Sequence, residues 1–254
     1  MTLNLFFSKY TETYPNKKLP SIELLLWFIG FAEVEGSFTI AKRGDLSFVI
    51  TQSSEYINIL NYIVKNLNFG KAIKQSVKSN THRFIVQDRL HLSIISLLFN
   101  GNMVFPTRAA KFNTFLSALN EKLLKHGENL ITPIYATVLP SLKDGWLAGI
   151  SDDEASFTCS ILSNSSNAYK FRYILTQKHD TNKEVLNHII RLFKGIGANG
   201  ALTPHNAEAV FEIRVNGINN CLNLFDYFDN FTLKTNKLNS YCKWKEVCYK
   251  LQDK

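Results

Sequence analysis

Two glutamates at matching places in an internal repeat are the residues best suited to chemistry. Aligning WFIGFAEVEGSF with WLAGISDDEASF puts Glu35 and Glu154 in register, at an offset of 119 residues (154 − 35). Each ends an apolar segment, where the negative end of a helix dipole disfavours a carboxylate. A divalent cation, which prefers oxygen ligands, would compensate for that placement. The alternative is an apolar core helix whose acidic end faces water.

The elements around these glutamates follow from the spacing of apolar residues. Phe28, Phe31 and Glu35 recur at helical spacing, as do Leu147, Ile150 and Glu154, so both glutamates continue an apolar helical stripe. Glu33 falls off that stripe. After each glutamate the sequence alternates between apolar and polar residues, which predicts a strand.

The same order of elements follows each motif, which predicts an α+β fold. The order is α-β-β-α-β-β-α-α, twice, as a pseudo-twofold pair packed through the motif helices, each half with an antiparallel sheet. Gly30 and Gly149 would allow those helices to approach closely and bring the two glutamates together. We assign 1–125 to the first half, 126–140 to a linker and 141–254 to the second half. Residues 1–20 are predicted to be a polar arm, and Ser21 to cap the first motif helix.

FIGFAEVEG and LAGISDDEA together resemble the two signature helices of a single-chain LAGLIDADG homing endonuclease. The acidic metal ligand of that motif falls on Glu35 and Glu154. Gly36 matches the final glycine, whereas Ala155 replaces it in the second copy, a mild change if the backbone avoids φ > 0. The resemblance implies hydrolysis of both strands of double-stranded DNA, with a staggered cut across the minor groove.

Further site residues follow from the resemblance by position. It implies Mg²⁺ held by Glu35 and Glu154 with the backbone carbonyls of Val34 and Asp153, and Ca²⁺ that binds without supporting cleavage. Other positions match the family's water-ordering glutamine and its lysine near the scissile phosphate. The alternatives are polar strand ends and cations that only contact the DNA backbone. These positions are Gln52 and Gln177 for the glutamine, Lys234 for the lysine and Arg108 as its counterpart in the first copy.

DNA contacts are expected from the outward positions of the predicted strands, which are small, polar or basic. Arg and Lys can read guanine in the major groove, while others contact only phosphates. Because the two halves differ at matched positions, for example Arg83 against Glu212, the target should be asymmetric. The predicted DNA-binding residues are Ser37, Thr39, Arg43, Ser47, Lys74, Ser76, Arg83, Ser156, Thr158, Ser160, Lys170, Arg172, Lys178 and Arg214.

Bulk properties favour the same partner. A net charge of +8 favours a polyanionic partner, nucleic acid before membrane. The four cysteines lack zinc-ligand spacing and are predicted to be reduced and mostly buried. No apolar run reaches the length needed to cross a bilayer. We expect the protein to be a monomer. The N-terminus shows neither a secretory signal nor a transit peptide.

Two other function classes stay open. One is an RNA-binding maturase that assists splicing of intron RNA, for which Glu35 and Glu154 would be dispensable. The other is a nuclease-dead DNA-binding protein with steep salt dependence. The resemblance also suggests an intron-encoded protein made inside a mitochondrion, although a cytoplasmic protein fits the sequence equally well.

Overall fold

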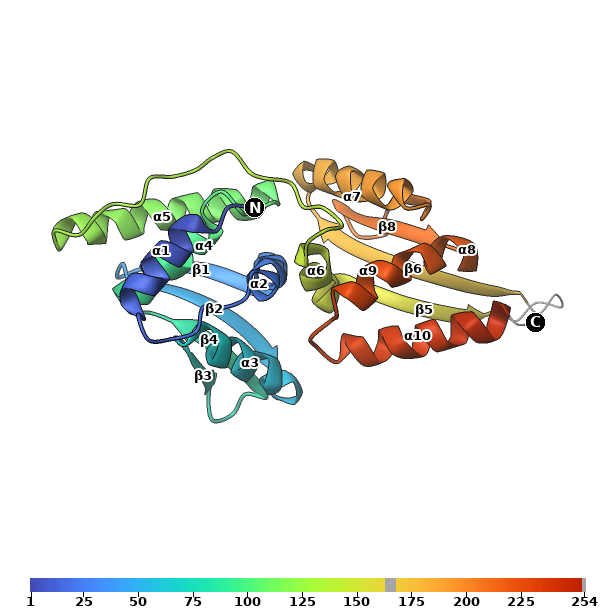
Figure 1. Cartoon of the computed structure of the whole chain (residues 1–254), viewed down its shortest axis with the longest axis horizontal. Coiled ribbons are helices and arrows are strands. Elements are labelled where there is room, and N and C mark those ends of the chain that lie inside the picture. Colours follow the sequence, from blue (N-terminus) through green and yellow to red (C-terminus); the bar gives the residue numbers. More distant parts are fainter. Residues whose placement is uncertain (163–167, 253–254) are drawn as a thin grey trace. The chain divides into compact units, whose positions relative to one another are not determined.

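The computed structural model describes residues 1–162 and 168–252 as two units, Met1–Pro140 and Ser141–Lys254 (Figure 1). Each unit is described by itself. The sequence also predicts a hairpin loop over Ser163–Asn167, which lies outside the described residues.

The first unit is an antiparallel sheet of four strands in the order β1-β2-β4-β3, with helices packed on one face. Alternate residues of β2 are buried, and Phe48 contacts Phe28 of the motif helix and Phe99 of a later helix. The elements are α1 (Asn4–Thr13), α2 (Ile22–Glu35), β1 (Gly36–Ile40), β2 (Leu46–Ser53), α3 (Ile57–Leu67), β3 (Lys71–Lys74), β4 (Thr81–Val86), α4 (Arg89–Phe99) and α5 (Pro106–Lys125).

The second unit repeats this design with the sheet order β5-β6-β8-β7. Its core is also aromatic: Phe157 contacts Tyr173 of the next strand and Trp244 of the closing helix. The elements are α6 (Trp146–Glu154), β5 (Ala155–Ile161), β6 (Tyr169–Lys178), α7 (Lys183–Gly195), β7 (Gly200–Pro204), β8 (Val210–Asn216), α8 (Ile218–Cys221), α9 (Phe225–Asn230) and α10 (Lys237–Gln252).

The predicted α+β class and the repeated order of elements are confirmed. The sequence pattern over Ile218–Phe228 predicts one helix, but the structure divides this stretch into α8, a short 3₁₀ turn and α9. Ser21 caps α2 as predicted, since its Oγ accepts the Leu24 amide at 3.2 Å. Pro106 begins α5, where a missing amide hydrogen costs nothing.

The N-terminal segment was predicted as a polar arm, but it contains α1, which buries apolar side chains. Phe6 and Tyr10, four residues apart, are fully buried, and the Tyr10 hydroxyl accepts a hydrogen bond from Asn68 at 2.7 Å. Just beyond α1, the Tyr14 hydroxyl hydrogen-bonds His91 of α4. Tertiary packing therefore makes this helix, which has little propensity of its own.

Residues 126–140 have no helix or strand, but they are fastened to the first unit. Asn120 of α5 exchanges two hydrogen bonds with the backbone of Ile131, at 2.8 and 2.9 Å. Asn100 does the same further along, with the Thr132 carbonyl and the Ile134 amide, both at 2.8 Å. The segment is thus a packed part of this unit rather than a loose tether.

The cysteines match their prediction only in part. Cys221 and Cys248 are buried, and burial raises the pKa of the Cys248 thiol to about 11, but Cys159 and Cys242 are exposed. None of the helices in the described part of the chain is long and apolar enough to cross a membrane.

Candidate active site and nucleic-acid interface

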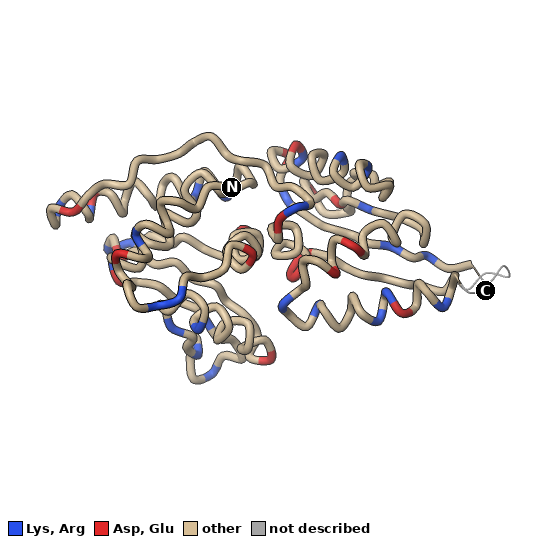
Figure 2. The backbone as a smooth tube through the Cα atoms, in the orientation of Figure 1, with Lys and Arg blue, Asp and Glu red and all other residues tan. Residues whose placement is uncertain are grey.

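The two motif glutamates occupy identical places in their units. Glu35 is the last residue of α2 and Glu154 the last of α6, and in each unit the first strand starts at the next residue. Both side chains are half-buried, so solvent reaches them. Figure 2 shows the acidic ends of both helices in red. The fold therefore holds one accessible carboxylate where each sheet begins.

A second acid in each motif is buried and ties the motif helix to a later helix. Glu33 is 1% exposed and accepts the amides of Val104 and Phe105, at 2.5 and 2.8 Å, just before α5. Asp152, 4% exposed, accepts the amides of Lys234 and Thr235 at 2.7 and 2.9 Å. The Thr235 hydroxyl adds a bond of 2.6 Å to Asp152.

We call this repeated arrangement of a buried acid and two backbone amides the acid clasp. It satisfies donors at the entrance of α5 and α10, which would otherwise lack partners. The sequence analysis placed Glu33 off the apolar stripe that carries Glu35, but it did not predict that Glu33 is buried. Helical periodicity identified the face turned to the sheet, whereas Glu33 points to the start of α5.

The two basic residues predicted near the scissile phosphate do not occupy equivalent positions. Lys234 is one of the two clasped residues that precede α10, whereas Arg108 lies three residues beyond clasped Phe105, inside the first turn of α5. Arg108 Nη2 donates to the Val34 carbonyl at 2.6 Å and Nη1 to the Gly36 carbonyl at 3.4 Å. Arg108 therefore hydrogen-bonds the carbonyls of the two residues that flank Glu35 in the chain.

This contact bears on the predicted metal ligands. The Val34 carbonyl has a second lone pair, but a guanidinium on the first disfavours a cation on the second. Over the described residues, no group of three or more His, Cys, Asp or Glu side chains could hold a metal ion. A metal beside either glutamate would also need backbone carbonyls, water or phosphate, a set that suits Mg²⁺.

The residue after each glutamate differs between the repeats for a steric reason. Gly36 has φ −77° and Ala155 φ −85°, so neither needs the left-handed region. A Cβ at Gly36, however, would lie 2.4 Å from the Ala32 carbonyl oxygen. The first repeat thus requires glycine for close packing, while the second accommodates Ala155.

The predicted glutamines lie near the motif but not on the open face of the sheet. Gly36 pairs with Ile50 and Ala155 with Leu175, two residues before Gln52 and Gln177. Gln177 pairs with Phe211, and Gln52 with His82, on the side of the sheet that the helices cover. The role of both as water-ordering residues stays a prediction.

The uncovered face of the second sheet carries every residue predicted for it. The cross-strand pairs Thr158–Arg172 and Ile174–Arg214 share that face. It also carries Glu212, which the sequence analysis did not include. These predicted residues are Ser156, Thr158, Ser160, Lys170, Arg172, Lys178 and Arg214.

The first sheet matches its prediction less well. Ser37, Thr39, Ser47 and Arg83 lie on the uncovered face. Lys74 pairs with His82 and so lies on the other face, because the strand begins at Lys71 and the register puts Lys71 and Ile73 outward.

Two more predicted residues of this unit lie in turns. Arg43 is in the β1–β2 turn, where it pairs with Asp45. Ser76 is in the β3–β4 turn, where its Oγ accepts the Ser79 amide at 3.1 Å. At both places the chain has already left the strand that the alternating pattern predicted.

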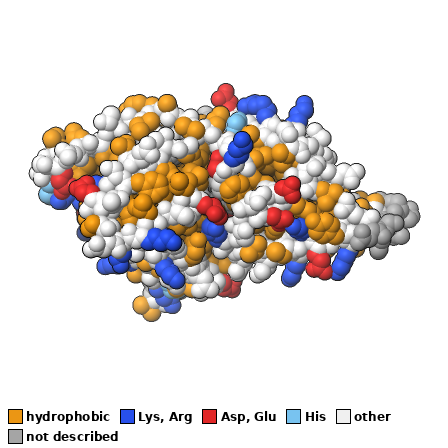
Figure 3. All heavy atoms as spheres, in the orientation of Figure 1, with side chains coloured by type: hydrophobic (Ala, Val, Ile, Leu, Met, Phe, Trp, Pro, Cys, Tyr) orange, Lys and Arg blue, Asp and Glu red, His pale blue; other side chains and the backbone are white. Residues whose placement is uncertain are grey.

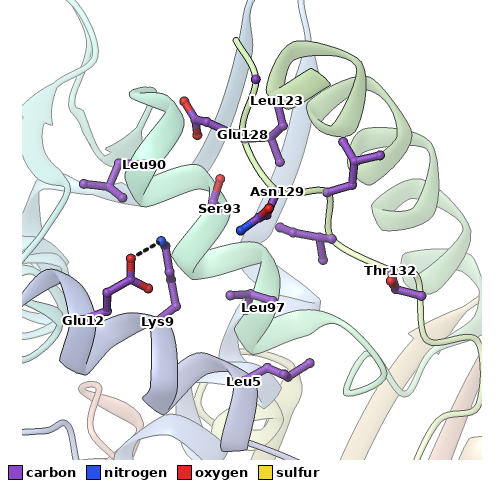
Figure 4. A pocket seen from close by; sticks show the side chains of 13 residues that line it. Leu5, Lys9, Glu12, Leu90, Ser93, Leu97, Leu123, Glu128, Asn129 and Thr132 are labelled. Atoms are coloured by element: carbon purple, nitrogen blue, oxygen red, sulfur yellow. Dashed lines mark hydrogen bonds and ion pairs between the residues drawn. The ribbon is translucent and has the colours of Figure 1, made fainter. Parts of the chain in front are cut away.

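A pocket of about 500 Å³ lies apart from these residues, among the helices that cover the first sheet. Leu5 and Lys9 of α1, Leu90 and Leu97 of α4, and Glu128 line it (Figure 4). Figure 3 shows hydrophobic side chains gathered on the visible face of this unit. The pocket adds nothing to the site at the motif glutamates.

Comparison with known proteins agrees with the fold and with its internal repeat. The family model described as LAGLIDADG endonuclease matches residues 28–119 and 147–248. The chain therefore belongs to the LAGLIDADG endonuclease family.

Solved structures and relatives support this assignment. The I-LtrWI LAGLIDADG homing endonuclease bound to target DNA has a TM-score of 0.72, 20% identity and 92% coverage of both chains. The meganuclease I-CpaMI bound to uncleaved DNA has a TM-score of 0.73 and 17% identity, covering 90% of this chain and 92% of that one. At these identities the likeness concerns the fold.

Among sequence relatives, a probable intron-encoded endonuclease 4 of Neurospora crassa is 37% identical over 236 residues. The match covers 89% of this chain but only 39% of that protein. An uncharacterized cox1 intron-2 protein of Schizosaccharomyces pombe is 22% identical, covering 89% of this chain and 66% of the relative. The chain thus spans less than two thirds of these relatives.

Proposed function

We propose that this chain is a site-specific, divalent-metal-dependent endonuclease that cuts both strands of a long, asymmetric DNA target. The observation that carries the proposal is the repeated placement of Glu35 and Glu154. Each ends a motif helix directly before a sheet whose uncovered face is polar and basic. Family membership and the DNA-bound solved structures support DNA as the substrate.

In this proposal Mg²⁺ is held by Glu35 and Glu154, with the Asp153 carbonyl and, less favourably, the Val34 carbonyl. A metal held by these groups would supply a Lewis acid that can activate water and stabilise the leaving oxygen. The chain's own cations, Arg108 and Lys234, stabilise negative charge on the scissile phosphates. Arg108 cannot shuttle a proton because its guanidinium stays charged.

Substrate recognition is assigned to the two uncovered faces. Their basic residues would neutralise phosphates, and their polar residues would contact base edges. The faces differ at matched strand positions, Arg83 against Glu212, which supports an asymmetric target and a monomer that acts alone. Relatives named for intron encoding support an intron-encoded origin, and we extend the proposal to a mitochondrial location.

The test is selection from a randomised duplex library, with Mg²⁺ and in parallel with Ca²⁺, followed by sequencing of the cut ends. We expect one long asymmetric motif, cut with staggered ends in Mg²⁺ only. Binding without cleavage in Mg²⁺ would contradict the proposal and favour a nuclease-dead binding protein. Retention of intron RNA but not DNA would favour a splicing maturase.

A further inference from the structure

The two sheets carry opposite charges at one matched row of their uncovered faces. In the first unit the row consists of Thr51, Arg83 and Ile73. In the second unit the row consists of Thr176, Glu212 and Thr203. A carboxylate on a face proposed to meet phosphates repels them, so its presence requires an explanation.

Glu212 is 7% exposed and is engaged by a neighbour on its own strand. Arg214 Nε donates to Glu212 Oε2 at 2.6 Å, and Arg214 Nη2 lies 2.5 Å from the same oxygen. His205 Nε2 lies 3.7 Å from the other oxygen, Oε1. The carboxylate therefore holds the side edge of the guanidinium, the edge formed by Nε and Nη2.

Holding that edge determines what Arg214 can still bind. A guanidinium has five N–H donors, and the Nε–Nη2 edge uses two of them. Of the remaining three, one on Nη1 and one on Nη2 point outward from the end of the group, as the fork that matches the O6 and N7 acceptors of guanine. The carboxylate also neutralises the guanidinium, which weakens its attraction to phosphate.

The first unit offers a contrast. Arg83 Nε is buried without a hydrogen-bond partner in the described part of the chain, and Arg83 shares its row with Thr51 and Ile73. No acid of that row holds its guanidinium. Arg83 keeps its full charge, which suits a phosphate contact.

We propose that Glu212 is a specificity-determining residue that positions Arg214 to read a guanine in the half of the target bound by the second unit. Glu212 acts through Arg214 and does not itself contact the DNA. This inference rests on the proposed DNA-binding function. It adds the residue pair and the base that the pair selects.

The test compares binding profiles of the full chain and its variants on a randomised duplex library without metal. In Glu212→Gln we expect the preference at one G·C pair to fall about tenfold, within the range for a bidentate contact. Overall affinity should rise, because Arg214 would no longer be neutralised by Glu212. The slope of log K against log salt should steepen by about 1, because the full charge of Arg214 would displace one more counterion from the DNA. Arg214→Ala should lose preference at the same base pair.

Glu208→Gln is the matched control. It removes the same charge from the exposed β7–β8 turn, four residues away, and should leave the base preference unchanged. Arg214→Lys keeps the ion pair but loses the fork, so it should also lose the guanine preference. It provides the test if Glu212→Gln unfolds, which a thermal melt would reveal.

Two results would overturn the inference while leaving DNA binding intact. One is that Glu212→Gln changes the affinity for all sequences by the same factor, while Arg214→Ala lowers the preference at one base pair. The other is loss of the preference in Glu212→Gln but not in Arg214→Ala, which would mean that Glu212 reads the base itself. If the unaltered chain enriches no sequence, the proposed function fails and this inference with it.

Discussion

The two units share a backbone plan but differ in how charge is placed on it. Each has a motif glutamate, a buried clasp acid and an uncovered sheet face. In the first unit Arg108 hydrogen-bonds the Val34 carbonyl beside Glu35, and on the sheet no acid in its row pairs with Arg83. The second has Lys234 in the clasped pair before α10, and an arginine neutralised by Glu212. The repeat thus preserves the geometry around the carboxylates, while the surrounding cations have diverged.

The largest expected effect is on the rate of DNA cleavage, and it tests whether the two glutamates are equivalent. Glu35→Gln and Glu154→Gln should each lower double-strand cleavage about 10³-fold or more, since metal-assisted stabilisation contributes several kcal/mol. Binding should persist. The measurement is cleavage of the selected target, resolved by strand. Full activity in one variant would show that only one unit has a catalytic glutamate.

The next effect tests the acid clasp. Glu33→Ala and Asp152→Ala should each destabilise their unit by about 3 kcal/mol, because buried amides lose a charged acceptor. Asp152→Ala should cost more, since the Thr235 hydroxyl also loses its 2.6 Å bond to the carboxylate and keeps only the longer contact, 3.1 Å, with the Asp152 carbonyl. Glu33→Gln keeps an acceptor and should cost less. Thermal and denaturant melts give the comparison, and a change below about 0.5 kcal/mol for either alanine variant would rule the clasp out as a stabilising feature.

A smaller effect should follow from the unequal basic residues. Arg108→Lys loses the fork to the Val34 and Gly36 carbonyls and should slow cleavage about tenfold, equivalent to about 1.4 kcal/mol. Lys234→Arg keeps a charge at its own position and should change the rate less. Strand-resolved nicking rates report this difference. Equal slowing by both variants would mean that the two cations act alike.

Arg83→Ala should weaken DNA binding by a few-fold and by the same factor for all sequences, because a phosphate contact carries no sequence information. The slope of log K against log salt should become shallower by about 1. Titration of two unrelated duplexes at several salt concentrations measures both. A loss confined to one sequence would make Arg83 a base reader like Arg214.

The smallest effect concerns α4 of the first unit. Burial raises the pKa of the Asp88 carboxyl, but hydrogen bonds from His91 outweigh it and set that pKa below its usual value. Since the folded pKa is depressed, the extra stability exists above the ordinary pKa of 3.8 and is lost as pH falls through the folded pKa. Asp88→Ala should cost about 1 kcal/mol at pH 7 as a lost helix cap.

The difference between Asp88→Ala and the unaltered chain should shrink below about pH 4, as the carboxyl protonates. Melting temperatures from pH 2.5 to 7 test this. Asp88→Asn, which still caps the helix but carries no charge, is the control: its stability should lie between the other two proteins at pH 7, and its difference from Asp88→Ala should not change in this pH range. A difference that is independent of pH would assign no role to the charge.

Much of the fold was predictable because the alternating and helical patterns repeat. The alternating patterns over Ser156–Ile161 and Lys170–Gln177 predict β5 and β6 to within one residue at each end, and Ser21 and the proline at 106 mark helix starts by local chemistry. Helix α1 could not be predicted, because Phe6 and Tyr10 gain their burial from elements far along the chain. Periodicity gives no account of such distant partners.

The site was predictable where the motif itself contains the residue. Glu35 and Glu154 follow from the repeat, whereas the burial of Glu33 depends on the approach of α5, which no local pattern encodes. Lys74 was misplaced because the polar residue was taken to face outward, whereas the register with β4 turns its apolar neighbour Ile73 outward. Glu212 was noticed only as a contrast to Arg83. An acid two residues before an arginine on one strand was the signal for the pair.

The segment that joins the units also determines how chimeric proteins should be built. Because Asn100 and Asn120 hold Ile131, Thr132 and Ile134, the segment belongs to the fold of the first unit. Recombination with a relative at residue 126 would separate those asparagines from the backbone they bind. Crossing over between Pro140 and Ser141 would transfer each unit whole, with its acid clasp intact, so new pairings of half-sites become accessible by exchange.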